Sequence, residues 1–344
     1  MTPDVELILK VAGFASPTGE RYGSHWEGVH FRGTAVYAQT EHGGMLATLE
    51  DVKVTCSVSR DLLVKALRAL SKGEHAVTFK VNKQALVITC DASTAELPLM
   101  DTSSAPAFYA PDPKLKWHVV EGLDAIARVA WAVSLDQTRP HLCTVRLCDD
   151  GFEAVDGTVM SRLETDTKWA TVLGRRVQVY PEFMTGLGSG RRWIACDEKH
   201  LFVSEDEAGT RYRVLKCAPD SMPDLSQLIP QRTPLAKVSR EALLAALKRV
   251  KSSARYVTLR ASHNRLAFES EAADAHTLFA IHDSIEIESP KNYPSAPINL
   301  DIGKLVAALG GLVDDEFQLG LDTGITPVVV RAGSYIAIVM PRRA

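Results

Sequence analysis

The sequence predicts an α+β protein made of three similar domains. Three observations predict this fold class: the chain length, an amphipathic helix pattern that recurs about every sixty residues, and a strand–turn–strand pattern after several of the helices. A chain of 344 residues is long enough for two or three domains of ordinary size.

Six segments have apolar residues spaced as on one face of a short helix. They begin near Asp4, Arg60, Gly122, Pro181, Arg240 and Asp301. In the third segment, the apolar positions at i, i+3, i+4 and i+7 are Ile126, Val129, Ala130 and Val133. Ser59 and Ser239 are predicted N-caps, because their hydroxyls can accept a hydrogen bond from the first helical turn.

Alternating apolar and polar residues predict β-hairpins in three places, at residues 76–88, 193–203 and 256–268. A further strand is predicted after each hairpin, at residues 95–100, 212–217 and 276–281. The repeating unit is therefore one helix followed by about four strands, and it occurs about six times along the chain.

Two such units are needed for one domain, because a single unit leaves one face of its sheet exposed. The predicted domains are residues 1–113, 114–232 and 233–344, with proline-bearing junctions at 111–113 and 231–234. The alternative is three unrelated α+β domains with accidental spacing, which the matching intervals disfavour.

Composition narrows the class of protein. The net charge of −3 argues against a domain that binds one DNA site tightly, but it is compatible with a protein that surrounds DNA. No run of 18 apolar residues predicts a membrane span, and the first residues lack the pattern of a secretory signal, so a cytoplasmic protein is expected. The six cysteines form no CxxC pair, which predicts reduced thiols and no zinc site.

Three stretches of the chain match motifs of one known protein family. Residues 136–142 and 151–157 are similar to that family's "RP-x-L … ATDG" segment. Residues 222–230 are similar to "FPDY..(V/L)(I/L)P", and residues 243–250 to the "LL-x-AL-x-RV" helix that follows it. Residues 335–343 are similar to the "Y-x-V-M-P-M-R-L" ending. With these motifs the chain resembles the bacterial DNA polymerase III β subunit, the β sliding clamp. The resemblance covers nearly the whole chain and is thinnest in the first 50 residues.

The resemblance implies a non-catalytic processivity factor for DNA polymerase III. It implies a head-to-tail homodimer of three-domain subunits, closed into a ring around duplex DNA. Its implied partners are the polymerase catalytic subunit, the clamp loader and other proteins with a clamp-binding motif, and it implies no cofactor and no membrane. Because such binding is topological, weak contacts from basic side chains to phosphates suffice. The candidate DNA-facing residues are Lys10, Arg21, Lys65, Arg68, Arg128, Arg139, Lys248, Arg249 and Lys304.

The resemblance also implies an apolar cleft that takes a short peptide from each partner. Met and aliphatic side chains suit this task, because they adapt to different extended peptides. The matching positions are Leu142, Val155, Asp156, Gly157, Pro223, Leu228, Ile338, Val339, Met340, Pro341 and Arg342. Leu142 and Val339 are equally well explained as core residues.

Several positions depart from the family pattern. A gap-free alignment places Val159 and Met160 where the family has Arg-Leu, and the helix near Pro181 lacks the family's "PRK" opening. Residues 342–344 are Arg-Arg-Ala, where the family usually has Met-Arg-Leu. Ser252 and Ser253 stand at the expected ring interface, where family members often have apolar residues. The alternative function is therefore a clamp-fold scaffold, or a specialised element-encoded clamp with altered partner specificity.

Enzyme motifs are absent from the sequence. The glycine-rich residues 186–190 are followed by Arg191, so neither GxGxxG nor a Walker lysine is present. There is no HExxH and no GxSxG. The acidic pairs at 149–150 and 314–315 are predicted to lie in solvated turns. No catalytic residue and no metal ligand is predicted.

Overall fold

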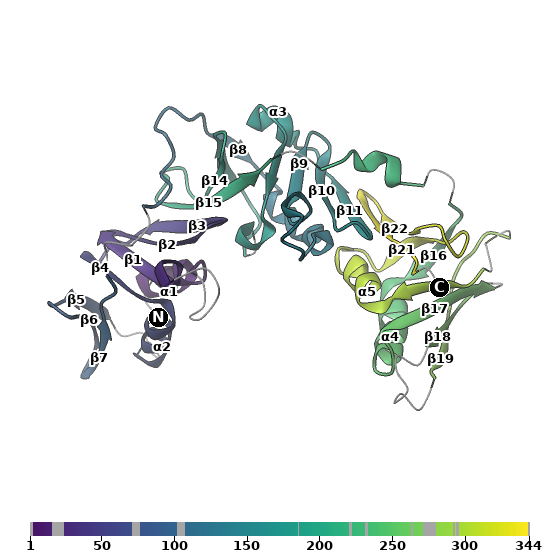
Figure 1. The fold of residues 1–344 in the computed structure, drawn as a ribbon, viewed down its shortest axis with the longest axis horizontal. Helices are drawn as coiled ribbons and strands as arrows, with labels where there is room; N and C mark the ends of the chain where they lie inside the picture. Colours follow the sequence, from purple (N-terminus) through teal and green to yellow (C-terminus); the bar gives the residue numbers. More distant parts are fainter. Residues whose placement is uncertain are drawn as a thin grey trace. The chain divides into compact units, whose positions relative to one another are not determined.

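The computed structural model (Figure 1) describes residues 3–15, 24–70, 76–101, 107–184, 186–219, 222–230, 233–262, 264–270, 280–291, 293 and 296–342. The chain forms two compact units. Unit 1 contains Met1–Glu121 and Ser189–Cys217, and unit 2 contains Gly122–Gly188 and Ala218–Ala344. The two parts of the predicted middle domain thus fall in different units, and the three predicted domain boundaries stay a prediction.

Unit 1 has an antiparallel eight-stranded sheet in the order β8-β13-β14-β15-β3-β2-β1-β4, and a three-stranded sheet β5-β6-β7. Its strands are β1 (Gly28–Gly33), β2 (Ala35–Thr40), β3 (Gly43–Thr48), β4 (Val54–Ser59), β5 (Val77–Val81), β6 (Ala85–Cys90), β7 (Ser93–Pro98), β8 (His118–Val120), β13 (Arg192–Cys196), β14 (His200–Ser204) and β15 (Arg211–Ala218). Its helices are α1 (Pro3–Ala12), α2 (Arg60–Leu70) and the 3-10 turn η1 (Ser24–Glu27). The two α-helices pack on each other, α1 against β2 and β3 and α2 against β4 and β7.

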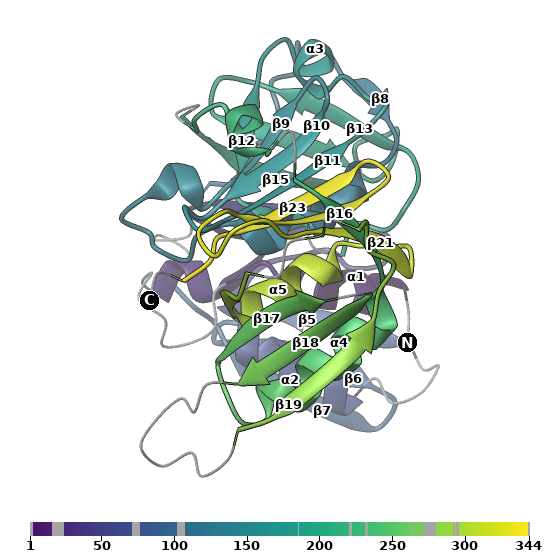
Figure 2. The same cartoon turned by 90° about the vertical axis from the view of Figure 1, so that its right-hand side faces the viewer.

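Unit 2 has a second eight-stranded sheet in the order β12-β9-β10-β11-β23-β22-β21-β16, and a four-stranded sheet β19-β18-β17-β20. Its strands are β9 (Val145–Cys148), β10 (Gly151–Val155), β11 (Val159–Glu164), β12 (Val177–Val179), β16 (Leu235–Ser239), β17 (Tyr256–Ser262), β18 (Arg265–Ser270), β19 (His282–Glu286), β20 (Ile298–Asp301), β21 (Glu316–Gly320), β22 (Val328–Ala332) and β23 (Tyr335–Val339). Its helical segments are α3 (Trp169–Leu173), α4 (Arg240–Lys251), α5 (Ile302–Gly310), η3 (Leu123–Arg128), η4 (Ala130–Ala132), η5 (Pro140–Leu142), η6 (Pro181–Met184) and η7 (Leu225–Leu228). In Figure 2, α5 lies beside the strands that end the chain and packs against β20 and β23, while α4 packs against α5, β16, β18 and β19.

Four of the six predicted helices are confirmed as α1, α2, α4 and α5. Ser239 is the predicted N-cap of α4, and its Oγ accepts a hydrogen bond from the Ala242 N–H at 3.2 Å. Asp301 caps α5 in the same way, accepting from the Lys304 N–H at 3.2 Å. Among the described residues, no helix is long and apolar enough to cross a membrane.

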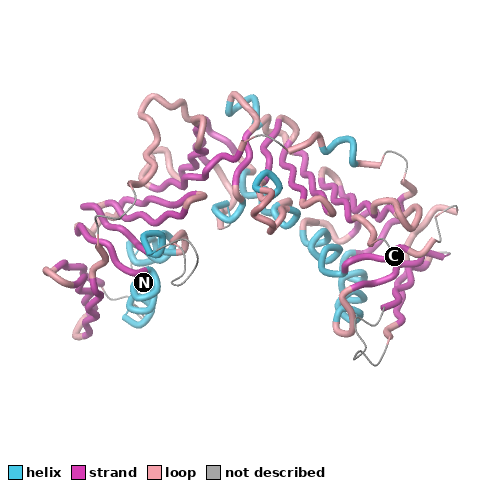
Figure 3. The backbone as a smooth tube through the Cα atoms, in the orientation of Figure 1, coloured by secondary structure: helices cyan, strands magenta, loops and turns pink. Residues whose placement is uncertain are grey.

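The predicted α-helices near Gly122 and Pro181 are wrong, because both segments form short 3-10 turns (Figure 3). In the first, the buried residues Leu123, Ile126, Val129 and Ala132 recur every three residues. Three is the period of a 3-10 helix, whereas the sequence pattern is also compatible with 3.6. In the second, η6 ends at Met184, and Gly186 two residues later has a φ of 67°, a left-handed conformation that does not continue a helix.

The three predicted hairpins are confirmed as β5-β6, β13-β14 and β17-β18. The strands that follow the first two are β7 and β15, close to the predicted positions. The third is predicted at residues 276–281, of which 276–279 lie outside the described residues. The strand that pairs with β18 there is β19, which begins at His282.

An arginine at the start of one helix closes the end of its neighbour in both helix pairs. Arg60 Nε, at the start of α2, donates to the carbonyl of Ala12 at the end of α1 (3.1 Å). Arg240 Nε, at the start of α4, donates to the carbonyl of Leu309 in the last turn of α5 (2.9 Å). The last carbonyls of a helix lack a hydrogen-bond donor within the helix and carry partial negative charge. A guanidinium supplies both a donor and a positive charge there.

The hydroxyl of Tyr335 joins three elements of unit 2. It accepts a hydrogen bond from Trp131 Nε1 at 3.0 Å and donates to the Ala308 carbonyl at 2.8 Å. A Cβ atom at Gly311 would lie 2.3 Å from this hydroxyl, so only glycine fits there. The fully buried Tyr335 therefore holds η4 and the end of α5 against β23.

Tyr335→Phe tests this junction. We expect the free energy of unfolding to fall by about 1–3 kcal/mol, because the substitution leaves the partly buried Trp131 N–H and the buried Ala308 carbonyl short of one partner. Urea denaturation followed by circular dichroism measures the change. Tyr109→Phe is the control, since Tyr109 is 39% exposed. Equal losses in the two variants would contradict the structural role of the Tyr335 hydroxyl.

Candidate functional site

The three stretches that carry the family resemblance meet on one face of the unit 2 sheet. Together with Met160 of β11, their side chains form an apolar cluster whose buried members are Leu142, Val155, Met160, Met222, Leu225 and Ile338. Ile229 and Ile336 pack against it and are partly buried. Three predicted cleft residues, Leu142, Val155 and Ile338, thus lie together as expected.

Strand register explains why these residues meet. In the antiparallel pair β10-β11, Val155 lies opposite Met160, and in β11-β23, Met160 lies opposite Ile338. Side chains directly opposite each other in adjacent strands point to the same face of the sheet. One row of three apolar side chains therefore crosses β10, β11 and β23.

The loop of residues 222–230 covers this apolar row. Asp224 accepts a hydrogen bond from the Ser226 N–H at 3.0 Å and caps the short turn η7. Leu225 is fully buried and Met222 is 6% exposed, both within the cluster. The loop therefore contributes side chains to the cluster.

Two large apolar side chains beside the cluster remain exposed. Leu228 is 48% exposed and directly precedes Ile229, which packs on the cluster. Met340 is 43% exposed, and its N–H donates to the Thr158 carbonyl at 2.9 Å. These two predicted cleft residues thus expose apolar surface beside the cluster.

The turn between β10 and β11 is fixed by Asp156. Its Oδ1 accepts hydrogen bonds from the N–H groups of Thr158 (2.6 Å) and Val159 (2.7 Å), and its Oδ2 lies 3.2 Å from Lys304 Nζ. Gly157 has a φ of 95°, which favours glycine. Burial raises the pKa of the Asp156 carboxyl, but the hydrogen bonds from Thr158 and Val159 and the charge of Lys304 outweigh burial, so its pKa lies below the ordinary value.

Beside the apolar row lies a buried ionic row. Arg146 donates to Glu153 Oε2 through Nη2 (2.6 Å) and Nε (3.1 Å), and both side chains are nearly inaccessible. Arg162 Nη1 lies 3.4 Å from Glu153 Oε1, and Arg162 also pairs with Asp150. Asp150 is thus an ion-pair partner as well as a turn residue.

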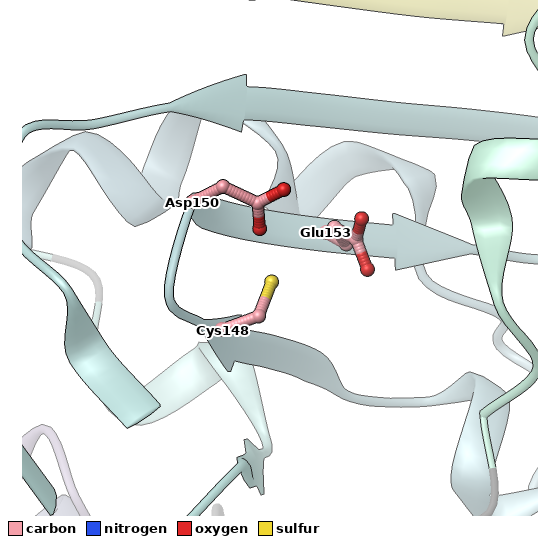
Figure 4. A group of neighbouring side chains, drawn as sticks. All are labelled: Cys148, Asp150 and Glu153. Carbon is pink, nitrogen blue, oxygen red and sulfur yellow. The ribbon is translucent and has the colours of Figure 1, made fainter. Parts of the chain in front are cut away.

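Cys148, Asp150 and Glu153 are the one group of potential metal ligands found among the described residues (Figure 4). The two carboxylates are already paired with arginine side chains. Burial, reinforced by Glu153 and Asp150, raises the pKa of the Cys148 thiol and disfavours the thiolate that a metal requires. The group fits an ionic row better than a metal site.

The remaining predicted cleft residues have other surroundings. Val339 is fully buried and follows Ile338 in β23, so its side chain points to the opposite face of the sheet and belongs to the core. Pro223 and Arg342 are exposed, and Pro341 is half-buried. The Arg342 guanidinium lies 4.3 Å from the centre of the Tyr256 ring.

Sequence reasoning missed five members of the cluster. These are Met160, Met222, Leu225, Ile229 and Ile336. The alternation of side chains along a strand could have found two of them. Ile336 lies two residues before Ile338 and therefore points to the same face of the sheet. Met160 lies on the face of β11 that pairs with Val155 and Ile338. The other three stand in the quoted 222–230 motif, but a loop has no period from which to predict burial.

Most of the predicted DNA-facing cations already have partners. Lys10 is 2.7 Å from Glu205, Arg139 is 3.1 Å from Asp136, and Arg249 is 2.7 Å from Asp283. Arg128 donates to the Gly311 carbonyl at 2.8 Å, and Lys304 pairs with Asp156. Arg21 lies outside the described residues.

Three predicted cations are exposed, and no ion pair to another described residue involves them: Lys65 and Arg68 on α2, and Lys248 on α4. They occupy exposed helix positions, so their charged groups are available to phosphates. The predicted DNA-facing set stays a prediction, and these three are its strongest members.

The repeated helix pairs, the long antiparallel sheets and the apolar cluster at the last strand define the fold of a DNA sliding clamp. Solved structures of the bacterial DNA polymerase III β subunit have this fold. The subunit from Thermotoga maritima matches with a TM-score of 0.81 and 16% identity, over 99% of this chain and 97% of that chain. The subunit from Pseudomonas aeruginosa matches with a TM-score of 0.79 and 16% identity, over 99% and 97%.

A third similar structure is the sliding clamp from Bartonella birtlesii bound to griselimycin. Its TM-score is 0.80 at 16% identity, over 99% of this chain and 98% of that chain. The resemblance predicted from sequence is therefore confirmed in the fold, along the whole length. No protein-family model matches the chain, and no curated protein matches it.

Asp156→Asn tests the charge in the β10-β11 turn. Asparagine keeps an oxygen for the two N–H groups but removes the charge facing Lys304, so we expect a loss of about 1–2 kcal/mol in unfolding free energy at pH 7. A carboxyl whose folded pKa is lowered stabilises the protein above its unfolded pKa of about 3.9, and this contribution is lost as the pH falls through the folded pKa.

The difference between wild type and Asp156→Asn should therefore be constant above about pH 5 and shrink below about pH 4. Urea denaturation across this pH range measures it. Asp166→Asn is the control, because Asp166 is exposed. A difference that persists unchanged below the folded pKa would refute the assignment.

Proposed function

We propose that this protein is a DNA sliding clamp that encircles duplex DNA and tethers the catalytic subunit of DNA polymerase III. The observation that carries the proposal is a likeness to bacterial clamps over 99% of this chain and at least 97% of theirs. The protein is then a non-catalytic processivity factor that acts in the cytoplasm, and it is loaded by a clamp loader.

In this proposal, DNA binding is topological and independent of base sequence. The exposed cations Lys65, Arg68 and Lys248 contact phosphates, and none of these contacts needs to fix a register. A closed ring cannot leave the duplex without opening, so it needs no strong electrostatic attraction to stay on DNA. The near-neutral net charge of −3 is therefore compatible with DNA binding of this kind.

The proposed ring is a head-to-tail homodimer. At the proposed interface, the hydroxyls of Ser252 and Ser253 point back to their own chain. Ser252 Oγ donates to the Arg249 carbonyl (2.6 Å), and Ser253 Oγ donates to the Val250 carbonyl (3.0 Å). Both hydroxyls are satisfied within the subunit, so they do not oppose burial against a second copy.

Size-exclusion chromatography with light scattering should give twice the chain mass, and a monomer at micromolar concentration would count against the ring.

A second candidate is a specialised clamp with altered partner specificity, in which the same fold acts as a scaffold. The observation that favours it is Val159, which is buried and stands where the family motif has arginine. A partner that depends on that arginine binds this protein poorly. Affinity for peptides from the host's polymerase and loader subunits discriminates the two candidates.

The decisive experiment is loading onto nicked circular DNA, followed by cutting the circle. A topological clamp stays on the circle and slides off the linear product. Retention on linear DNA after cutting, at the same salt, would overturn the proposed mechanism.

Lys65→Ala with Arg68→Ala tests the DNA-facing assignment. We expect the slope of log K against log salt for duplex DNA to decrease by about 0.9 for each phosphate that is no longer neutralised, hence by up to about 1.8. Lys80→Ala with Lys83→Ala is the matched control, since these exposed lysines lie on the β5-β6 hairpin of the same unit. Fluorescence anisotropy with a labelled duplex gives both slopes. Equal slopes in the two double variants would remove α2 from the DNA-facing surface.

Leu228→Ser and Met340→Ser test the partner surface. Griselimycin, which is bound in the Bartonella birtlesii clamp, serves as the probe. We expect each variant to weaken binding about tenfold, which corresponds to the removal of a well-packed apolar side chain that contributes about 1.4 kcal/mol. Ile325→Ser is the control, because Ile325 is 81% exposed and lies outside the cluster. Isothermal titration calorimetry measures the affinity, and unchanged values would remove both residues from the site.

A further inference from the structure

We propose that Arg146 is the positioning residue of the partner surface: it ties the 222–230 loop to the sheet and so sets the shape of the apolar cluster. This inference rests on the proposed function, because it concerns the surface that partners use. It assigns a role to a buried arginine that lies outside the quoted family motifs.

The loop depends on Arg146 for its attachment. Arg146 Nη1 donates to the Met222 carbonyl at 2.8 Å, and Nη2 donates to the Pro223 carbonyl at 3.1 Å. Among the described residues, these are the only hydrogen bonds that join residues 222–230 to the sheet. The bonds within the loop, such as Ile229 N–H to the Ser226 carbonyl at 3.4 Å, shape the turn but do not anchor it.

Strand register explains how one side chain can do this. Arg146 on β9 lies opposite Glu153 on β10, and Glu153 lies opposite Arg162 on β11. Val155 and Met160 lie two residues from Glu153 and Arg162 on β10 and β11, and Ile338 lies opposite Met160, so the ionic row and the apolar row share one face of the sheet. The loop lies across both rows, with two carbonyls on the first and the side chains of Met222 and Leu225 on the second.

The chemistry at this position requires arginine. Glu153 fixes the guanidinium plane through Nε and Nη2, which leaves donors on Nη1 and Nη2 for the two loop carbonyls. The planar fork of a guanidinium meets several acceptors at once in a fixed geometry, whereas an ammonium group does not hold that geometry. Both Arg146 and Glu153 are buried, so water cannot take over these bonds easily.

Arg162 provides a matched control within the same ionic row. It contacts Glu153, Asp150 and Glu164, and none of its described contacts reaches the loop. Arg146→Met leaves Glu153 paired with Arg162, and Arg162→Met leaves Glu153 paired with Arg146. Each variant therefore removes one arginine from the ionic row, but only the first releases the loop.

The experiment compares Arg146→Met and Arg162→Met in the full-length protein by hydrogen exchange and by griselimycin affinity. For Arg146→Met, we expect the amides of residues 224–229 to exchange at least about tenfold faster, and griselimycin to bind about tenfold more weakly. For Arg162→Met, both values should stay within about twofold of wild type. Exchange in β17 and β18 reports whether either variant unfolds globally.

If Arg146→Met fails to fold, Arg146→Lys replaces it, since lysine keeps the charge beside Glu153 and lacks the fork; its loop amides should still exchange faster than those of Arg162→Met. Loop exchange equal to that of the Arg162 variant would overturn the inference. If wild-type protein does not bind griselimycin, the proposed partner surface loses support, while the exchange measurement still decides the role of Arg146.

Discussion

The pairing of β11 with β23 is the constraint on which the rest of unit 2 depends. It joins residues 159–163 to residues 335–339, far apart in the sequence, and its register places Met160 opposite Ile338 and Leu163 opposite Tyr335. The first of these pairs continues the apolar row from β11 to β23. The second lies where the Tyr335 hydroxyl fastens η4 and the end of α5. A shift of one residue would move each side chain of β23 to the other face and remove both features together.

Arginine side chains make many of the internal connections of this chain. Arg60, Arg128 and Arg240 donate to backbone carbonyls at helix ends, and Arg146 donates to carbonyls of the 222–230 loop. A count of basic residues on the predicted helices therefore overstates the charge available to DNA. The helix-end role of Arg60 and Arg240 recurs in the two helix pairs, which is the structural counterpart of the repeat seen in the sequence.

The sequence patterns predicted four helices and three hairpins correctly because each has its own period and end signals. They failed at residues 122–133, where burial at Leu123, Ile126, Val129 and Ala132 follows a period of three that a short segment cannot distinguish from 3.6. The motif resemblance predicted which segments meet at the candidate site. It could not predict Arg146, because that role depends on which strands are neighbours and in what register, and a single sequence states neither.

The alternation of side chains between the two faces of β11 also decides how the site departs from the family pattern. Val159 and Met160 occupy the family's Arg-Leu positions, and Met160 supplies the apolar side chain that faces the cluster. Arg162, the next arginine in the chain, has the parity of Met160 and is held by Glu153 and Asp150. It therefore cannot take the place of an arginine at position 159, whose side chain points to the opposite face. Residues 159–162 thus supply Met160 to the apolar row, while Val159 faces away from it and Arg162 is held in the ionic row. Under the proposed function, partner selectivity then depends on apolar side chains such as Leu228 and Met340, and on how firmly the 222–230 loop holds Leu228.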